Sequence, residues 1–416
     1  MPIHVLISGA GIAGPALAWF LAKSGSRVTI VEKAHTSLSH GQNIDIKGSA
    51  VQVIRKMGLL EEVRRFNTTE MGTQFIDSNG NPFAPFPVQK GTGASFTSEY
   101  EILRGDLAEV FHQATKDHPN IKYYFGTTIK NVISNNDTSV EVELSNGDTQ
   151  QFDLLVAADG QWSKVRKQCF PSDSVKMIDL GMYSTYWTVP RLPSDNSWWN
   201  IYLGLKSRDI HLRPDPHNTI RAMFTIMPCN DFQKRKWKEA CRSDRQTQEE
   251  LLKEEFVDAG WQAQRLLEAM EKAPDFYFQE IQQVRMSKWS SSRVVCLGDA
   301  AHCPSPLTGM GTSLAIIGAY VLGGELSKLD NGEHPSKALE SYESIFRPFV
   351  EEIQKIPWFV PGIAHPETAS KRWLVQSMAW TISKIAAIPW VVGRFGPKSD
   401  EEDFQLPLYS SFENVS

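Results

Sequence analysis

The sequence has few cysteines and none of the spacings that form redox pairs or metal sites. Its 416 residues include five cysteines, with no CxxC pair and no grouping with histidines, at Cys169, Cys229, Cys241, Cys296 and Cys303. This excludes a dithiol redox centre and leaves no candidate metal ligands. Because such a scattered, odd set is typical of a reducing compartment, we expect a cytoplasmic protein.

The charges give no support for a nucleic-acid partner. There are 43 basic and 48 acidic residues, a formal net charge of -5, and no basic block recurs with interleaved aromatic residues. The hydrolase signature GxSxG and the zinc-protease signature HExxH are also missing. The composition therefore favours a small neutral or acidic ligand.

Only one segment approaches the hydrophobicity of a membrane span. It is WLVQSMAWTISKIAAIPWVVGRF, residues 373–395, and Gln376, Lys384 and Pro389 interrupt it. It therefore falls short of the uncharged run of about 20 residues that a spanning helix needs. We expect no spanning helix here but a helix packed on the protein, with peripheral membrane contact as the alternative.

The N-terminal residues have the pattern of a dinucleotide-binding βαβ unit. Residues 4–34 have the pattern of an apolar strand, followed by a glycine turn, a helix and a second strand that ends at Glu32. In GAGIAG, Gly9 permits a tight turn, Gly11 lets a pyrophosphate approach the backbone, and Gly14 lets the helix pack closely on the strand. The carboxylate of Glu32 can accept hydrogen bonds from a ribose.

A second polar turn follows an apolar strand in the middle of the chain. In ADGQWSKVRK, Asp159 and Gly160 precede Ser163 and Arg166 at the expected start of a helix. Since serine is a favoured helix cap and arginine is often merely solvated, an ordinary strand end is an equally good interpretation of this segment alone.

A second glycine-rich turn, GDAAHCPSPLTGMGTSLA, occurs late in the chain at residues 298–315. Pro306 stiffens the loop, and Gly309 and Gly311 expose backbone amides ahead of a helix that begins near Thr312. A helix N-terminus favours negative charge on a bound ligand.

Taken in order, the motifs GxGxxG, DGxxSxxR and GDAAHxxxPxxGxG resemble the class A flavoprotein monooxygenases with the para-hydroxybenzoate hydroxylase fold. The resemblance covers about residues 3–345, and GQNIDIKGSAVQVIRKMGLL looks most like the tetracycline-modifying branch. It implies FAD as cofactor, NADPH or NADH as reductant, O2 as cosubstrate, and oxygenation of the substrate by a flavin C4a-hydroperoxide.

The resemblance also implies which residues hold FAD. Glu32 would bind the adenosine ribose and Asp299 the ribityl and pyrophosphate region, while DGxxSxxR is linked to both FAD and the nicotinamide cofactor. The implied contacts are Gly9, Gly11, Ala13, Gly14, Glu32, Lys33, Arg104, Asp159, Gly160, Arg166, Asp299, Pro306, Gly309, Gly311 and Thr312. Two positions depart from the family pattern, which commonly has Asn at Ser313 and an acidic residue near Gly318.

The resemblance and the strand patterns together predict an α/β fold. We expect a Rossmann-like FAD-binding domain with an inserted, mostly antiparallel β substrate domain and a C-terminal helical segment. The predicted FAD-binding parts are 1–70, 101–175 and 281–345, the substrate domain comprises a hairpin at 71–100 and a sheet at 176–280, and the helical segment is 346–416.

Four side chains of the predicted middle sheet are candidates for substrate contact or proton transfer, namely Tyr186, Tyr202, His211 and Arg213. For each, an ordinary position in the core or on a solvated face is the alternative. The predicted activity is hydroxylation or epoxidation of an apolar or aromatic small molecule, a secondary metabolite or xenobiotic. Baeyer-Villiger oxygenation and non-catalytic binding of FAD or a ligand are the alternatives.

Overall fold

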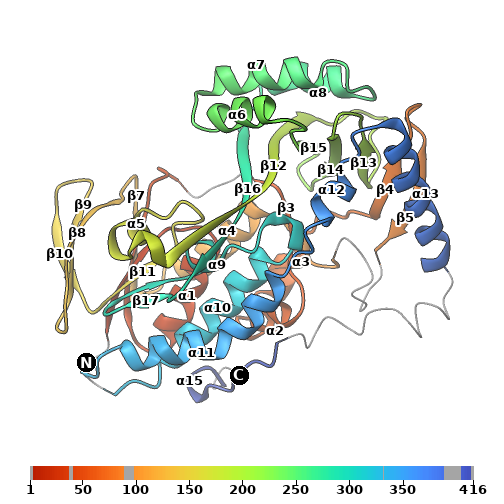
Figure 1. The fold of residues 1–416 in the computed structure, drawn as a ribbon. Coiled ribbons are helices and arrows are strands. Elements are labelled where there is room, and N and C mark those ends of the chain that lie inside the picture. Colours follow the sequence, from red (N-terminus) through yellow and green to blue (C-terminus); the bar gives the residue numbers. More distant parts are fainter. Residues whose placement is uncertain (1–2, 37–40, 89–97, 331, 388–403, 414–416) are drawn as a thin grey trace.

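The structure is a computed structural model that describes residues 3–36, 41–88, 98–330, 332–387 and 404–413. Figure 1 shows two bodies, which we call the α/β body and the β body. The α/β body occupies the lower left of the view, and the β body the upper right. A pair of long strands, β12 and β16, runs from one to the other.

The α/β body is built on a six-stranded sheet with the order β17-β18-β11-β1-β2-β7. All neighbours from β18 to β7 pair in parallel, and β1, β2, β11 and β18 are almost entirely buried, as expected when helices cover both faces. The strands are β1 (His4–Ser8), β2 (Arg27–Glu32), β7 (Ile121–Phe125), β11 (Leu154–Ala157), β17 (Ser290–Ser291) and β18 (Val294–Cys296).

Helices surround this sheet, and two small sheets adjoin it. The helices are α1 (Ala13–Lys23), α2 (Ser49–Lys56), α3 (Leu60–Arg65), α4 (Arg104–Thr115), α5 (Lys164–Cys169), α9 (Asp299–His302), α10 (Gly311–Leu326), α11 (Ser336–Ile353) and α15 (Ser410–Glu413). The small sheets consist of β3 (Asn43–Asp45) with β6 (Glu101–Leu103), and of β8 (Ile129–Asn135), β9 (Val140–Leu144) and β10 (Thr149–Phe152).

The β body is a seven-stranded sheet with the order β16-β12-β15-β14-β13-β4-β5, antiparallel except between β13 and β4. Three helices cover one of its faces, where Trp187, Phe224 and Phe256 are almost completely buried. The elements are β4 (Gly72–Ile76), β5 (Pro82–Pro87), β12 (Val175–Pro190), β13 (Trp199–Leu203), β14 (Arg208–Pro214), β15 (Thr219–Ile226), β16 (Tyr277–Met286), α6 (Asp231–Ala240), α7 (Arg245–Phe256) and α8 (Ala263–Met270).

The ribbon formed by β12 and β16 joins the two hydrophobic cores. At one end Val284 and Met286 are part of the core of the α/β body, and at the other Tyr183 and Trp187 are part of the core of the β body. The pairing is irregular between Asp179 and Met182, where the intervening Gly181 has φ +70°.

The C-terminal segment adds two helices to the β body, α12 (Val360–Ala364) and α13 (Ala369–Ala386). Ala379 of α13 packs against Ala84 and Phe86 of β5. The predicted mixture of a Rossmann-like body, an antiparallel sheet and C-terminal helices is confirmed. Residues 373–386 of the apolar segment lie in α13, whereas 388–395 lie outside the described residues.

Candidate active site

The first glycine turn is shaped by close backbone approaches. Gly9 has φ +111°, and an added Cβ would lie 2.5 Å from the carbonyl oxygen of Ala158. At Gly14 a Cβ would lie 2.1 Å from the carbonyl oxygen of Gly9, so the start of α1 touches the turn. At Gly11, by contrast, no atom lies within 4 Å of the point that a Cβ would occupy, which leaves room for a ligand against the backbone.

The carboxylate of Glu32 holds this turn to the end of β2. One oxygen accepts from the backbone N–H of Ala10 and the other from that of Ala34, both at 2.9 Å. Each carboxylate oxygen can accept a further hydrogen bond, so Glu32 is still able to bind a ribose. The neighbouring Lys33 is exposed.

The second polar turn follows β11. The Ser163 hydroxyl caps α5 by accepting from the Arg166 N–H, and Asp159 Oδ2 accepts from the Lys164 N–H at 2.8 Å. The other oxygen, Asp159 Oδ1, is buried without a hydrogen-bond partner. Since a buried polar atom is normally paired, this oxygen indicates space for a ligand donor. Beside it, Gly160 has φ +81° and open space at its Cβ position.

Arg166 connects the second turn to the third. Its guanidinium is buried and donates to the carbonyl oxygens of Ala300 and Gln161, each at 2.7 Å. The guanidinium of Arg166, a predicted cofactor contact, is therefore occupied in holding the backbone of these two turns.

The third turn surrounds the N-terminus of α10. A Cβ on Gly311 would lie 3.8 Å from Asp299 Oδ1, and one on Gly309 would lie 3.8 Å from Lys47 Nζ. The Ser313 hydroxyl accepts from the backbone N–H of Lys47 at 2.9 Å, so the residue that departs from the family pattern has a structural bond. The other two predicted residues of this turn differ in exposure, since Pro306 is exposed and Thr312 is half-buried.

Asp299 lies in a charged neighbourhood. Burial raises its pKa, and the nearby Arg104 at the start of α4 acts in the opposite direction. Arg104 and Asp299 both also influence Tyr277 of β16, whose pKa is raised mainly by burial. The structure thus brings two of the predicted FAD contacts to the edge of the β body.

The three turns meet at one edge of the six-stranded sheet. Ser8, Ala157 and Cys296 are register partners on the adjacent strands β1, β11 and β18, and each turn starts just after one of them. A Cβ added to Gly298 of the third turn would lie 3.2 Å from the Cβ of Ala13 in α1. The carboxyl ends of parallel strands are the usual place for a dinucleotide. The open glycine positions, the unpaired Asp159 oxygen and the N-termini of α1 and α10 fit FAD.

Comparisons with known proteins identify the family. A family model described as "FAD binding domain" matches residues 2–355. The chain belongs to the FAD-dependent monooxygenases of this family. The FAD-dependent monooxygenase asL6 of Sarocladium schorii is 35% identical to the enzyme, with 99% of each chain covered. Monooxygenase CTB7 of Cercospora beticola is 34% identical, with 98% of this chain and 97% of the relative covered.

Solved structures agree with this assignment. Tetracycline destructase Tet(55) superposes on the enzyme with a TM-score of 0.77 at 29% identity, covering 98% of this chain and 99% of that one. Klebsiella pneumoniae HpxO, complexed with FAD and uric acid, shares the fold with a TM-score of 0.69 at 20% identity, covering 91% of this chain and 93% of that one. The predicted FAD cofactor and the predicted monooxygenase class are confirmed.

One face of the seven-stranded sheet is turned away from helices α6 to α8. A row of half-buried or half-exposed, mostly apolar side chains crosses this face from strand to strand, interrupted only by the buried His211. In strand order the row is Tyr277, Tyr186, Met223, His211, Ile201, Phe75 and Phe83. We call this row the aromatic row. Its first member, Tyr277, is the one on whose pKa Arg104 and Asp299 both act.

Tyr202, a candidate for substrate contact or proton transfer, does not belong to the aromatic row. It is buried on the opposite face, where it stacks on Trp261 with ring centroids 5.7 Å apart. Side chains alternate along a strand, so Ile201 and Tyr202 of β13 must point to opposite faces. Only Ile201 is in the row.

His211 is buried in the row and not solvated. Its Nδ1 accepts from the Trp199 indole N–H at 3.0 Å, and burial lowers its pKa to about 3. A histidine with that pKa is neutral at physiological pH. His211 therefore presents an uncharged ring on the sheet face.

Arg213 lies one step further along β14 on the same face, and it is held by two carboxylates. Glu70 accepts from Nε and Nη2 at 3.0 Å each, and Glu101 accepts from Nη2. Burial would lower the pKa of Arg213, but Glu101 and Glu70 outweigh that effect and raise it. Burial also raises the pKa of Glu101, against the opposing effect of Arg213. We call Glu70, Glu101 and Arg213 the arginine clamp.

Sequence reasoning missed Lys47, Tyr277 and both carboxylates of the arginine clamp. Glu70 and Arg213 are 143 residues apart and belong to no motif, so their contact could not be inferred from spacing. A usable signal existed for Tyr277, which belongs to the aromatic run of residues 276–278 where β16 begins.

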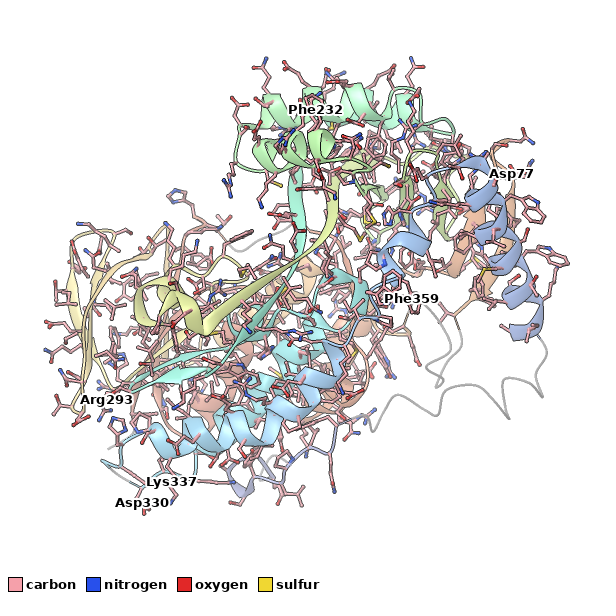
Figure 2. All side chains as sticks on the ribbon, viewed as in Figure 1. Asp77, Phe232, Arg293, Asp330, Lys337 and Phe359 are labelled. Atoms are coloured by element: carbon pink, nitrogen blue, oxygen red, sulfur yellow. The ribbon has the colours of Figure 1, made fainter. Side chains whose placement is uncertain are left out.

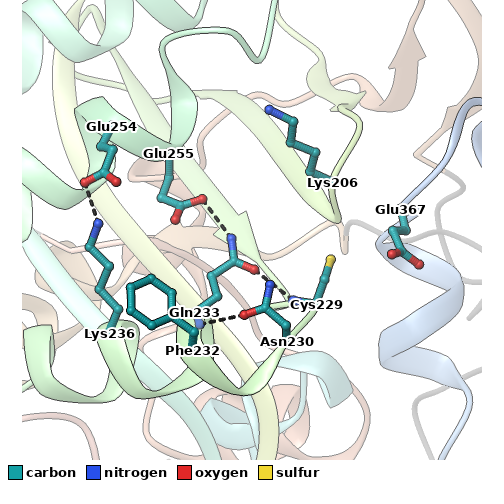
Figure 3. A pocket seen from close by; sticks show the side chains of 9 residues that line it. All are labelled: Lys206, Cys229, Asn230, Phe232, Gln233, Lys236, Glu254, Glu255 and Glu367. Carbon is teal, nitrogen blue, oxygen red and sulfur yellow. Dashed lines mark hydrogen bonds and ion pairs between the residues drawn. The ribbon is translucent and has the colours of Figure 1, made fainter.

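A groove of about 330 Å³ lies on the other side of the β body (Figure 3). Its polar side chains bond to one another, Lys236 with Glu254 and Gln233 with Glu255. None of the three turns contributes a residue to this groove, so it is separate from the FAD site.

Proposed function

We propose that the enzyme uses NADPH or NADH and O2 to hydroxylate or epoxidise an apolar or aromatic small molecule held between the aromatic row and the FAD site. The observation that carries the proposal is the aromatic row itself, which gives the sheet an apolar lining beginning beside Arg104 and Asp299. Pockets for small molecules are mostly apolar with a few polar groups. The substrate would be a secondary metabolite or a xenobiotic. We place the enzyme in the cytoplasm.

FAD held by Glu32, Asp159 and Asp299 would supply the hydride-transfer and oxygen-activating chemistry. The side chains of the enzyme bind and orient. Tyr186 and neutral His211 can donate or accept hydrogen bonds from the row, while its apolar members exclude water from the reacting atoms. The polar turns at the strand ends hold the cofactor.

The proposed FAD contacts keep the residues expected from the sequence, with one refinement. Glu32, Asp159 and Asp299 offer acceptors at the edge of the sheet, whereas Arg166 supports the turns from below through Ala300 and Gln161. We propose the same division of the chain into three FAD-binding parts and an inserted substrate domain, since the strands of the two sheets alternate along the sequence in that way.

The arginine clamp favours a neutral substrate over an anionic one. An arginine facing a substrate pocket commonly pairs with a carboxylate, but here two protein carboxylates already pair with Arg213. A substrate carboxylate placed beside the clamp would approach Glu70 and Glu101 as well. Like charges at short range in a buried site repel strongly.

The test is consumption of NADPH or NADH by the flavin-loaded enzyme with a panel of aromatic and polycyclic compounds, followed by mass spectrometry of the product. We expect stimulated consumption and a product heavier by one oxygen atom. Ring expansion to an ester or lactone in that product would favour Baeyer-Villiger oxygenation instead. Failure of every apolar compound to stimulate consumption, with anionic compounds active, contradicts the proposal.

The clamp is tested with amide and acid versions of one substrate. We expect a lower KM for the amide than for the acid. In Glu101→Gln the difference between the two KM values should be smaller, because the substitution removes a negative charge beside Arg213. A wild-type enzyme that prefers the acid refutes the role given to the clamp.

A further inference from the structure

The outer face of α13 carries exposed apolar side chains that no helix or strand of the described residues covers. Six large apolar side chains of this helix are between 46% and 68% exposed. They are Trp373, Leu374, Met378, Trp380, Ile382 and Ile385, which we call the α13 outer face. Several large exposed apolar side chains on one helix indicate an interaction surface, whereas single exposed apolar residues are normal.

The helix has two distinct sides. Ala379 and Ser383 are buried toward the β body. On the exposed side, Leu374, Met378 and Ile382 recur every four residues and form one stripe, because such residues are neighbours along a helix. Trp373 and Trp380, seven residues apart, lie together on the other flank of that side.

Figure 1 places α13 at the right-hand edge of the molecule, and side chains of α13 point outward from that edge in Figure 2. Within the described ranges, which end at residue 387 and resume at 404, no helix or strand covers this side. The α13 outer face is therefore open to a partner outside these elements.

The charges beside the patch are positive. Lys371, Arg372 and Lys384 belong to α13, and the sequence has no acidic residue from 368 to 399 although the whole chain has a net charge of -5. Glu367 precedes the helix and pairs with Lys371 at 3.2 Å. Lys384 lies 5.7 Å from the centre of the Trp380 ring. The patch thus combines aliphatic side chains, tryptophans and excess positive charge.

We propose that the α13 outer face binds the surface of an anionic phospholipid bilayer. Interfacial helices have this composition, with leucine, isoleucine and tryptophan inserted into the headgroup region and basic side chains on anionic lipids. The helix has 18 residues, and none of the described helices is long and apolar enough to cross a membrane, so it lies along the interface.

A second copy of the chain fits the α13 outer face less well. In a symmetric dimer the same patch occurs on both subunits, so the basic side chains of two α13 helices would face each other. A bilayer with anionic headgroups instead offers charges of the opposite sign.

The position of α13 also suggests why the enzyme would bind there. Its buried side contacts β5, which carries Phe83 at the end of the aromatic row. A lipophilic substrate leaving the bilayer would therefore arrive at the apolar end of the row. This last point rests on the proposed function, whereas lipid binding itself does not.

The experiment is sedimentation of the full-length, flavin-loaded protein with vesicles made of equal parts of phosphatidylglycerol and phosphatidylcholine, or of phosphatidylcholine alone. We expect binding to the anionic vesicles that weakens as salt is added. Replacing Leu374, Met378 and Ile382 by Ser should weaken binding by roughly tenfold or more, since each substitution removes several buried methylene equivalents. Lys371→Gln with Lys384→Gln should weaken it by about 25-fold, at about fivefold for each basic residue.

A matched control replaces three exposed apolar residues elsewhere, Ile133, Val257 and Leu408, which are 52%, 69% and 76% exposed. This variant should bind vesicles like the wild type. Flavin content and melting temperature, unchanged in all variants, show that each one folds.

Three results overturn the proposal. One is a wild-type protein that stays in the supernatant with both vesicle types. Another is equal loss of binding in the α13 triple variant and the control. The third is a dimer in solution that the α13 substitutions dissociate, because the face would then be a protein interface. Lipid binding without turnover of any apolar compound would contradict the proposed function and leave this inference standing.

Discussion

The glycines of the first turn have different roles: Gly14 is needed for tight packing of the fold, whereas Gly11 leaves room for the cofactor. Substitution of each by alanine tests this difference. A Cβ at position 14 would lie 2.1 Å from the backbone oxygen of Gly9, about 1 Å closer than atoms tolerate, and a backbone atom cannot rotate away. Overpacking of this kind costs about 1–3 kcal/mol, and we expect Gly14→Ala at the upper end. The melting temperature of the FAD-free protein should fall by several degrees.

Gly11→Ala should behave differently. No atom lies within 4 Å of the Cβ position there, so the FAD-free protein should melt at the wild-type temperature or slightly above it. If the FAD pyrophosphate lies against the backbone at Gly11, the added methyl group pushes it outward. We expect FAD affinity to fall by about tenfold or more, which corresponds to about 1.4 kcal/mol.

The assay pairs thermal unfolding of the FAD-free protein, followed by circular dichroism, with titration of FAD by flavin fluorescence. A Gly11→Ala protein that binds FAD with wild-type affinity would refute the placement of the cofactor over this turn. A Gly11→Ala protein that is as unstable as Gly14→Ala would refute the description of the turn.

Four further outcomes are expected. Asp299→Ala should lower FAD occupancy after purification, and full flavin content with unchanged activity would remove Asp299 from the site. Tyr186→Phe should lower kcat/KM, whereas Tyr202→Phe should leave it unchanged because that hydroxyl lies on the far face of the sheet. Arg166→Met should lower the free energy of unfolding by about 3–6 kcal/mol, since two charged hydrogen bonds of about 1.5–3 kcal/mol each are lost, and a urea titration showing a loss under 1 kcal/mol contradicts this. Burial lowers the pKa of His302 to about 3, so the unfolded chain takes up a proton below about pH 6.5 while the folded protein does not. The stability that His302 contributes is complete above pH 6.5 and is lost as the pH falls. The loss amounts to about 2 kcal/mol between pH 7 and pH 5. The urea midpoint of His302→Gln should therefore decline less over that pH range than the midpoint of the wild type.

The three turns that form the candidate FAD site were predictable because their signals are local. Each turn follows directly on an apolar strand. Within each motif the glycines and polar residues are only a few positions apart, as for Asp159 in the second motif and Asp299 in the third. Adjacent parallel strands then align the three turns without further information. The antiparallel sheet and the packed helix α13 were predictable for the same reason, from alternation and from polar interruptions.

The substrate face was less predictable because it depends on distant contacts. Tyr186 and Tyr202 look alike in sequence, and only strand register decides that one faces the row and the other the core. The alternation gives two faces, but it does not say which one the helices cover. Glu70 and Glu101 reach Arg213 from another part of the chain, so a charge that looked solvated is buried and compensated.

The ribbon of β12 and β16 has a mechanical consequence. Its two strands are hydrogen-bonded from one body to the other, and their ends are embedded in separate cores. Any movement of one body relative to the other requires this ribbon to bend. Bending costs least where the ladder is already interrupted, between Asp179 and Met182 at Gly181. We therefore expect any bending between the two bodies to be concentrated at that short interruption.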